Sequence, residues 1–367
     1  MLTRSLKGRA TLTDSPDSID LFVPGRLCLF GEHADWAAQF GRYPGYCMVI
    51  GTDQGISATA RAAERFTVEL EKKDWLRSAA KVPVPVFDCP WDRAALLAAA
   101  EDRSQFFRFC AAVAHEMHGM PGVGGGIALR ITAMDLPLGK GVSSSAAVCI
   151  LVARAFDAIY ALQMLPSELM DAAYRGERLT GSQCGRMDQA CIYGRTPVLL
   201  TFRGARAVRV EPVPVGGPIH MFIVDLAGRK DTVRILADLC RAYVTSDSLI
   251  DALGPGNERI VRRACGALGR GDAAELGRLM TEAQRLFDRA VAPHSAEQLA
   301  SPALHALLAM EALGEYVYGG KGVGSQGDGT AQFVARSPAA RDAATAAIHA
   351  EHPHMRCFAL DIPSTRA

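Results

Sequence analysis

The sequence predicts a mixed α+β protein of two domains. Its 367 residues exceed the length that a single hydrophobic core usually organises. Apolar residues make up 49% of the chain, which is typical of a globular protein rather than a disordered one. Short β-branched or aromatic runs alternate along the chain with longer segments whose apolar residues recur every three or four positions. Strands and helices are therefore interspersed, as in α+β folds.

Strand patterns dominate the first part of the chain. Four β-branched or aromatic runs, separated by turn residues, predict strands at residues 21–31, 46–51, 56–61 and 66–70. The spacing then becomes helical over residues 103–118. The apolar positions of this predicted helix are Phe106, Phe107, Cys110, Val113, Ala114 and Met117. Another strand is predicted at residues 127–132, where the β-branched pattern returns.

A long helix is predicted after the Pro- and Gly-rich turn at residues 136–141. Residues 145–163 contain no Gly or Pro, which favours an uninterrupted helix. One face of this helix carries Ala147, Leu151, Ala155, Ile159 and Leu162. Pro166 ends the segment, and Ser167 is a start signal for a second helix as far as Leu179.

Strands and helices continue to the end of the chain. The predicted strands are residues 197–202, 207–210, 220–225, 331–335 and 355–359, and the predicted helices are residues 231–243, 257–268, 272–290 and 301–313. The Pro- and Gly-rich residues 212–218 form either a linker or a hairpin between strands. As a linker, they divide the chain into expected domains at residues 1–211 and 212–367.

The charge pattern excludes a general affinity for polyanions. The formal net charge is +1, and no run of Lys and Arg forms a basic patch, so we expect neither a nucleic-acid nor a membrane partner. Residues 1–15 are polar, and no segment has about 18 uninterrupted apolar residues. We therefore expect a cytoplasmic protein whose anionic ligands are held by a local site.

The ten cysteines are dispersed through apolar patterns, which favours reduced core residues over a disulfide framework. Cys184 and Cys191 are too far apart for a C-x2-C zinc site, and His115 with His118 lacks the H-E-x-x-H spacing. We expect no structural metal.

The first candidate functional segment is P-L-G-K-G-V-S-S-S-A-A, at residues 137–147. Two glycines allow close approach of a ligand to the backbone, three serines supply hydroxyl groups, and a predicted helix follows at once. Free N–H groups and the positive end of the helix dipole make an anion site. The alternative is a helix capped by serine after a flexible turn. The segment lacks the G-x-x-x-x-G-K-[ST] pattern of a Walker loop.

The second segment is P-G-R-L-C-L-F-G-E-H-A-D-W, at residues 24–36. Ionisable side chains gather where an apolar strand stops, and such a place can present donors and acceptors to a polyhydroxylated ligand. The alternative is an ordinary solvated turn.

The third segment, at residues 176–189, is G-E-R-L-T-G-S-Q-C-G-R-M-D-Q. Glu177 lies at the end of a predicted helix and Asp188 follows a Gly-containing loop. One carboxylate is suited to magnesium and the other to a reacting hydroxyl. Each acid taken singly is more often solvated.

The fourth segment, at residues 319–329, contains six glycines in G-G-K-G-V-G-S-Q-G-D-G. So many glycines cost chain entropy on folding, which indicates backbone kept bare for close approach. A disordered linker is the alternative, but a predicted strand at residues 331–335 follows directly and favours a site.

In this order and spacing, the four segments resemble the GHMP kinase family, which is named for galactokinase, homoserine kinase, mevalonate kinase and phosphomevalonate kinase. The resemblance runs from residue 21 to residue 335. It implies a two-domain α+β fold, with a ribosomal protein S5 domain 2-like N-terminal domain and a ferredoxin-like C-terminal domain. The first would hold the serine loop and a catalytic aspartate, and the second the late glycine loop. ATP and substrate would bind in the cleft between them.

The resemblance also implies roles for residues at the phosphates. Asp188 matches the catalytic aspartate of the family, and Arg26 would keep that carboxylate ionised and balance charge at the reacting oxygen. Ser145 and Glu177 would bind Mg²⁺. The residues that would line the ATP phosphates are Gly139, Gly141, Ser143, Ser144, Ser145 and Ala146. Positioning and cations would stabilise a loose transition state, with Asp188 acting as a base or as an orienting charge.

The expected substrate is a sugar. The residues that match substrate-binding positions are Glu32, His33, Asp35, Gly324, Ser325 and Gly327. Galactokinase-like enzymes read G-E-H-T-D-Y and mevalonate kinases read G-E-H-A-V-V, whereas this chain reads G-E-H-A-D-W. The run C-G-R-M-D-Q is close to the galactokinase C-G-x-M-D-Q. We therefore favour an ATP-dependent sugar 1-kinase of the galactokinase-like branch, as a monomer or homodimer with a small-molecule substrate.

Departures from the family pattern leave the sugar open. Trp36 replaces a tyrosine, residues 37–45 form a long connection, and Lys140, Gln326 and Asp328 alter the glycine loops. Trp36, Arg42 and Tyr43 are placed to reshape an acceptor pocket. A uronic acid, arabinose, a fucose-like sugar, a heptose or an aminosugar are alternatives to galactose. A mevalonate kinase-like activity on a non-sugar alcohol, and a non-catalytic sensor of sugar and ATP, are the alternatives to a sugar kinase.

Overall fold

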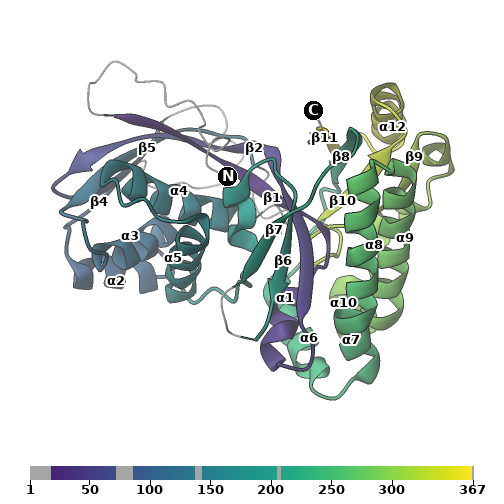
Figure 1. Cartoon of the computed structure of the whole chain (residues 1–367), viewed down its shortest axis with the longest axis horizontal. Helices are drawn as coiled ribbons and strands as arrows, with labels where there is room; N and C mark the ends of the chain where they lie inside the picture. Colours follow the sequence, from purple (N-terminus) through teal and green to yellow (C-terminus); the bar gives the residue numbers. More distant parts are fainter. Residues whose placement is uncertain (1–17, 72–85, 137–142, 205–207, 366–367) are drawn as a thin grey trace. The chain divides into compact units, whose positions relative to one another are not determined.

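The computed structural model describes residues 18–71, 86–136, 143–204 and 208–365 (Figure 1). These residues form strands and helices in two compact units, so the predicted α+β class is confirmed. The first unit contains the described residues of 18–26, 53–136 and 143–194. The second contains those of 27–52 and 195–365. Each unit thus draws on several parts of the chain, and the expected domain boundary between residues 211 and 212 stays a prediction.

The first unit contains a sheet and a group of helices. Its strands are ordered β4-β3-β5-β2, where β3 runs parallel to β5 and the other neighbours are antiparallel. The strands are β2 (Gly45–Ala63), β3 (Phe66–Leu70), β4 (Val86–Cys89) and β5 (Gly126–Met134). The helices are α2 (Arg93–Glu101), α3 (Arg108–His118), α4 (Ser144–Ile159), α5 (Pro166–Leu179) and the 3-10 helix η3 (Asp188–Tyr193). Helix α3 packs against α2, α4 and α5, and this central position explains its fully buried middle.

The second unit contains an antiparallel sheet of order β11-β8-β10-β9. These strands are β8 (Ile219–Asp225), β9 (Val317–Gly322), β10 (Thr330–Ala335) and β11 (Arg356–Ile362). The first part of β2 also pairs here with β6 (Val198–Phe202), which pairs with β7 (Arg209–Pro212). Strand β1 (Ile19–Phe30) pairs with β2.

The second unit also contains helices, several of which pack against its main sheet. Helices α8 (Asn257–Arg270) and α9 (Ala273–Ala290) contribute to the core under the sheet. The other helices are α1 (Ala34–Ala37), η1 (Ala38–Phe40), α6 (Thr232–Tyr243), α7 (Asp247–Asp251), η4 (Ala252–Gly256), η5 (Ala292–Ser295), α10 (Ala296–Leu299), α11 (Pro302–Leu308), η6 (Glu311–Glu315) and α12 (Pro338–Glu351). Helix α12 and helix α11 form a further core with β8 and β10.

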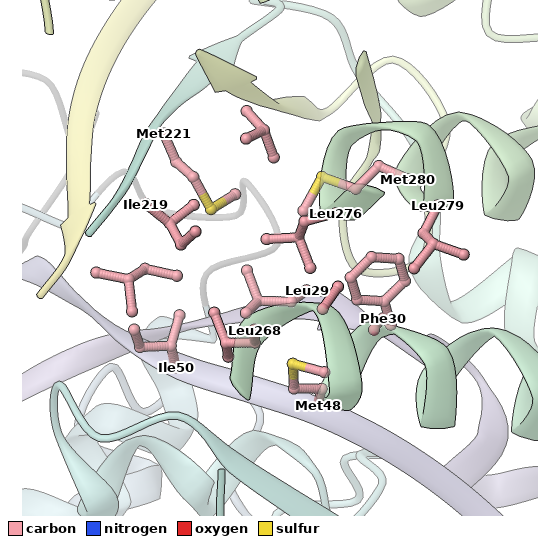
Figure 2. Packing of buried hydrophobic residues seen from close by; sticks show 14 of the residues in the cluster. Leu29, Phe30, Met48, Ile50, Ile219, Met221, Leu268, Leu276, Leu279 and Met280 are labelled. Carbon is pink, nitrogen blue, oxygen red and sulfur yellow. The ribbon is translucent and has the colours of Figure 1, made fainter. Parts of the chain in front are cut away.

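Figure 2 shows the core that fixes the end of β1 in the second unit. Leu29 and Phe30 of β1 and Met48 of β2 pack with Leu276 and Met280 of α9, and all five are fully buried. Each such side chain contributes about 1.5–3 kcal/mol relative to an exposed one. The residues that follow β1, which include the predicted sugar-binding segment, therefore start from a rigid base.

The predicted break between strands 46–51 and 56–61 is wrong, because β2 runs without interruption from Gly45 to Ala63. The turn residues between these two predicted strands end with Gly55. A Cβ atom at Gly55 would lie 2.4 Å from the Phe22 ring and 2.5 Å from the Val23 carbonyl oxygen. This glycine therefore allows β1 to approach closely, which is a packing role that also favours glycine within a strand.

Several helix boundaries also differ from the prediction. Helix α5 begins at Pro166 rather than after a Ser167 cap, in keeping with the preference for proline in the first helical position. The predicted helix over residues 301–313 is divided into α11 and η6. Helices α2 and α12 were not predicted, although Asp92 and Ser337 cap them through hydrogen bonds from the N–H groups of Ala95 and Ala340. The structure contains the ten cysteines as free residues, of which six are buried and four are partly exposed.

Candidate active site

The start of helix α4 carries backbone donors. Its first intrahelical bond runs from the N–H of Ala147 to the carbonyl oxygen of Ser143, at 3.0 Å. The amides of residues 144–146 precede that bond and have no carbonyl within the helix to reach. Ser143 adopts a left-handed conformation, with φ of 57°, and its side chain does not cap the helix. The alternative of a serine-capped helix is therefore wrong, and these amides lie at the positive end of the helix dipole.

Arg26 joins this helix start to Asp188. The guanidinium Nη2 of Arg26 donates to the hydroxyl oxygen of Ser143 and to Oδ1 of Asp188. Arg26 is buried at the end of the first unit's part of β1, whereas the Asp188 side chain is 25% exposed. The structure thus brings Arg26 together with two residues that lie 117 and 162 positions later in the sequence.

Glu177 forms a second polar group beside them. The hydroxyl of Ser145 donates to Oε1 of Glu177, and Nε2 of Gln189 donates to Oε2, both at 2.8 Å. Glu177 is only 1% exposed. Burial, followed by the negative charge of Asp188, raises the pKa of Glu177 to about 7, against the opposing hydrogen bonds from Ser145, Gln189 and Cys184. Gln189 was not predicted as a site residue, although it ends the run C-G-R-M-D-Q directly after Asp188.

This polar group fits a magnesium ion. Mg²⁺ prefers hard oxygen ligands, and proteins often supply only one or two carboxylates while phosphates and water complete the shell. Glu177 and Ser145 offer a carboxylate and a hydroxyl side by side. Glu177 and Asp188 repel each other, as the raised pKa of Glu177 reflects. A divalent cation here would relieve that repulsion.

In the second unit, the segment after β1 holds Glu32, His33 and Asp35 in buried positions. The ammonium group of Lys321, which is 1% exposed, forms an ion pair with Oε1 of Glu32. Lys321 also donates to the carbonyl oxygen of Gly322 at 2.9 Å. Lys321 was not predicted as a site residue, although a single Lys within six glycines is an unusual pattern. The pair fixes the direction of the Glu32 carboxylate.

His33 is held by aromatic side chains. Nε1 of Trp36 donates to Nδ1 of His33 at 3.0 Å. The ring of His33 stacks on Phe287, with centroids 5.9 Å apart. Burial, followed by the charge of Lys230, lowers the pKa of His33 to about 3, with Lys321 adding to the effect and the backbone of Ser325 opposing it. His33 is therefore uncharged at neutral pH.

The late glycine loop is an ordered connection between β9 and β10, so the alternative of a disordered linker is wrong. Gly324 and Gly327 adopt left-handed conformations, with φ of 66° and 72°. The hydroxyl groups of Ser325 and Thr232 lie 3.1 Å apart. Oδ1 of Asp328 accepts from the N–H of residue 304 at 2.9 Å, near the start of α11. The departure at Asp328 thus has a structural role.

The departures at Trp36, Arg42 and Tyr43 lie against α6 and η4, whereas Lys140 lies outside the described residues. Trp36 is part of a cluster with Tyr243. Nη2 of Arg42 donates to the carbonyl oxygen of Val244 at 2.9 Å. A Cβ atom at Gly254 would lie 2.8 Å from the Tyr43 ring. These contacts give Trp36, Arg42 and Tyr43 partners in the second unit.

The predicted site residues therefore fall into two groups. The first unit contains Arg26, Ser143, Ser144, Ser145, Ala146, Glu177 and Asp188, and the second contains Glu32, His33, Asp35, Gly324, Ser325 and Gly327. Gly139 and Gly141 lie outside the described residues. A shared cleft for ATP and substrate stays a prediction, as do the individual roles.

Comparison with known proteins relates the residues of this site to a protein family. Residues 105–195 match the family model of the GHMP kinases N terminal domain. That range includes the start of α4, Glu177 and Asp188. These residues form a GHMP kinase N-terminal domain. The chain is also 25% identical to the galactokinase of Thermococcus kodakarensis over 300 residues, which are 72% of this chain and 76% of the relative. The predicted resemblance to the galactokinase-like GHMP kinases is confirmed.

Solved structures of GHMP kinases share the fold. The galactokinase of Lactococcus lactis, complexed with galactose, has a TM-score of 0.71 at 18% identity, with 96% of this chain and 95% of that chain covered. The mevalonate kinase of L. major, in complex with R-mevalonate, has a TM-score of 0.69 at 17% identity, with coverage of 98% and 100%. At these identities the likeness concerns the fold.

Together, the family match and the curated relative identify a phosphotransferase with an alcohol group as acceptor, a kinase of sugars or related small molecules. A search of the described ranges for a helix of membrane-spanning length and hydropathy found none.

Proposed function

We propose that this GHMP kinase transfers the γ-phosphoryl group of ATP to a monosaccharide or sugar derivative, with the anomeric hydroxyl as the acceptor. The observation that carries the proposal is the position of Arg26, which contacts both Ser143 at the start of α4 and the carboxylate of Asp188. One cation thus lies between a phosphate-binding helix start and an acid suited to a reacting hydroxyl.

The helix start would hold the terminal phosphates of ATP. GHMP kinases use ATP as donor, and the amides of residues 144–146 are suited to phosphate oxygens. Ser144 and Ser145 are partly exposed, so their hydroxyl groups can reach a ligand. Ala146 is fully buried and offers only its backbone. Gly139 and Gly141 are proposed to complete the phosphate loop.

Glu177 and Ser145 would hold Mg²⁺, which supplies charge neutralisation and orientation for the transferred phosphoryl group when bound. Gln189 donates to Oε2 of Glu177, and Ser145 donates to Oε1. This arrangement orients the carboxylate. The raised pKa of Glu177, about 7, means that the carboxyl is a mixture of protonated and ionised forms near neutral pH, and a bound cation would favour the ionised form.

Asp188 would accept or orient the proton of the attacking hydroxyl. The Arg26 guanidinium forms an ion pair with this carboxylate and places positive charge beside the reacting oxygen. Phosphoryl transfer passes through a loose transition state, so positioning and cations carry most of the catalysis. Arg26 and Asp188 act on this view as a unit.

Glu32, His33 and Asp35 would bind the hydroxyl groups of the sugar, with Gly324, Ser325 and Gly327 close to the acceptor. The galactokinase of T. kodakarensis and the galactose complex of the L. lactis enzyme support a sugar, although the mevalonate kinase fold is nearly as similar. Asp35, the residue that separates the two sequence patterns, supports the sugar. A buried carboxylate suits hydroxyl donors better than it suits the carboxylate of mevalonate.

Release of ADP in the presence of an acceptor panel tests the proposal. The panel contains galactose, arabinose, fucose, a uronic acid, a heptose and an aminosugar, with mevalonate and homoserine as the non-sugar acceptors. We expect a sugar to stimulate ADP release in the presence of Mg²⁺, with a phosphate signal on the anomeric carbon in the NMR spectrum of the product. Stimulation by mevalonate or homoserine alone would contradict a sugar kinase. Binding of ATP and sugar without any ADP release would indicate a sensor.

A further inference from the structure

The two oxygens of the Glu177 carboxylate have different surroundings. The hydroxyl of Ser145 donates to Oε1, and Nε2 of Gln189 donates to Oε2, both at 2.8 Å. Ser145 is partly exposed, whereas Gln189 is fully buried. A cation that arrives from solvent therefore meets the Oε1 side of the carboxylate, because protein encloses the Oε2 side.

The 3-10 helix η3 holds Gln189 in place. This helix packs against α4 and α5, and the next two residues in it, Ala190 and Cys191, are also buried. Nε2 of Gln189 lies 4.0 Å from Sγ of Cys184, whose thiol adds a further hydrogen bond to Glu177. An amide enclosed in this way keeps its donor at Oε2.

The direction of the Gln189 amide follows from its partner. The ionised carboxylate that a cation requires can only accept hydrogen bonds, so the nitrogen of the amide, and not its oxygen, must face Oε2. The amide oxygen of Gln189 has no hydrogen-bond partner among the described residues. The contact with Glu177 is therefore the strongest polar contact that the structure gives to this side chain.

Divalent cations differ in how they use a carboxylate. Mg²⁺ is small, requires a near-ideal octahedron and keeps several water molecules. Ca²⁺ is larger, takes more oxygen ligands in a flexible geometry and often binds both oxygens of one carboxylate. An amide donor at Oε2 competes with a cation for that oxygen, so it disfavours the second mode of binding.

We propose that Gln189 is a positioning residue that occupies Oε2 of Glu177, so that the carboxylate offers only Oε1 to a cation and the site selects Mg²⁺ over Ca²⁺. The inference rests on the proposed function, which places a divalent cation at Ser145 and Glu177, and it adds the basis of the selectivity. Because Gln189 follows Asp188 directly, the same short helix carries the proposed acid and orients the metal-binding carboxylate.

Nucleotide binding without turnover tests the inference. Isothermal titration calorimetry gives the dissociation constant of a non-hydrolysable ATP analogue in saturating Mg²⁺ and in saturating Ca²⁺, and the ratio of these constants measures the selectivity. We expect the parent protein to prefer Mg²⁺. Gln189→Met removes the donor and keeps much of the volume, and it should reduce this preference about tenfold, as is common for residues that orient a metal ligand.

The matched control is Gln332→Met. Gln332 of β10 is also fully buried, donates through Nε2 to the carbonyl oxygen of Cys28 at 2.7 Å, and has no described partner at its amide oxygen. The control should show a similar loss of stability in thermal unfolding but keep the ratio of the parent. The same change of ratio in both variants, or an unchanged ratio in Gln189→Met, would contradict the inference.

A second variant keeps the test decisive if the methionine variant does not fold. Gln189→Glu has nearly the same shape and replaces the donor with a carboxylate, and added carboxylate oxygens favour Ca²⁺, so the preference for Mg²⁺ should again fall. A ratio equal to that of the parent would overturn the inference.

Glu177→Gln separates the inference from the proposed function. This variant should lose most of the gain in nucleotide affinity that Mg²⁺ gives relative to EDTA. If the gain persists, the cation is not bound at Glu177, and the proposed metal site fails together with the inference. If the gain is lost but Gln189→Met keeps the ratio of the parent, the inference alone fails.

Discussion

Asp188→Asn is expected to reduce kcat about 100-fold or more while ATP binding stays nearly intact. Removal of a positioned acid–base group commonly has an effect of this size. The amide keeps the shape of the side chain but removes the charge that pairs with Arg26 and the oxygen that accepts a proton. The phosphates would be held by the start of α4, so the affinity for ATP should depend little on this change.

The measurement compares kcat and the dissociation constant of ATP in the parent and the variant. Asp171→Asn is a matched control, because Asp171 is also paired with an arginine, at 3.2 Å from Nη1 of Arg186, and lies on helix α5 of the same unit. The control should retain its turnover. Equal kcat in the parent and Asp188→Asn would remove Asp188 from the mechanism.

Arg26→Met is expected to lower kcat by about 100-fold or more, and Arg26→Lys by less. The methionine keeps much of the volume of this buried side chain but removes the donors to both Ser143 and Asp188. A lysine restores the charge but lacks the planar fork that can contact two oxygens at once. Because the guanidinium and the carboxylate act as a unit, the double variant Arg26→Met/Asp188→Asn should be little worse than Asp188→Asn alone.

Steady-state kinetics of the three variants tests this interpretation, with thermal unfolding as a check on folding. The control is Arg175→Met, since Arg175 forms an ion pair with Glu116 at 2.7 Å in the same unit and should be replaceable without loss of turnover. Fully additive losses in the double variant would show that Arg26 and Asp188 act independently, in conflict with the contact between them.

The strongly periodic elements could be predicted from the sequence, whereas their interruptions could not. Helices α4 and α9 and strand β8 follow hydrophobic patterns that leave little choice. The unbroken strand β2 could not be predicted, because the packing reason for Gly55 involves Phe22 and Val23 of β1, which are far from it in the sequence. Helix α12 has a short apolar stripe among many alanines, with Ala344 and Ile348 as its buried residues, so its pattern was weak.

The residues of the candidate site likewise differ in whether they could be predicted from the sequence. Residues in local motifs, such as Ser145, Glu177 and Asp188, could be selected from the sequence because their chemistry and spacing are characteristic. Lys321 and Gln189 could not, because their roles come from partners fixed by the tertiary fold: Glu32 is 289 positions away from Lys321. Trp36 was noted only as a departure, and its hydrogen bond to His33 depends on the rotamers of both rings.

The most direct test of the account is a crystal structure of the protein with Mg²⁺, a non-hydrolysable ATP analogue and the sugar that gives the highest turnover. We expect terminal phosphates within hydrogen-bond distance of the amides of residues 144–146, and Mg²⁺ about 2.1 Å from oxygens of Ser145 and Glu177. We also expect the acceptor hydroxyl beside Asp188. Nucleotide bound away from the start of α4, or a sugar remote from Asp188, would contradict it.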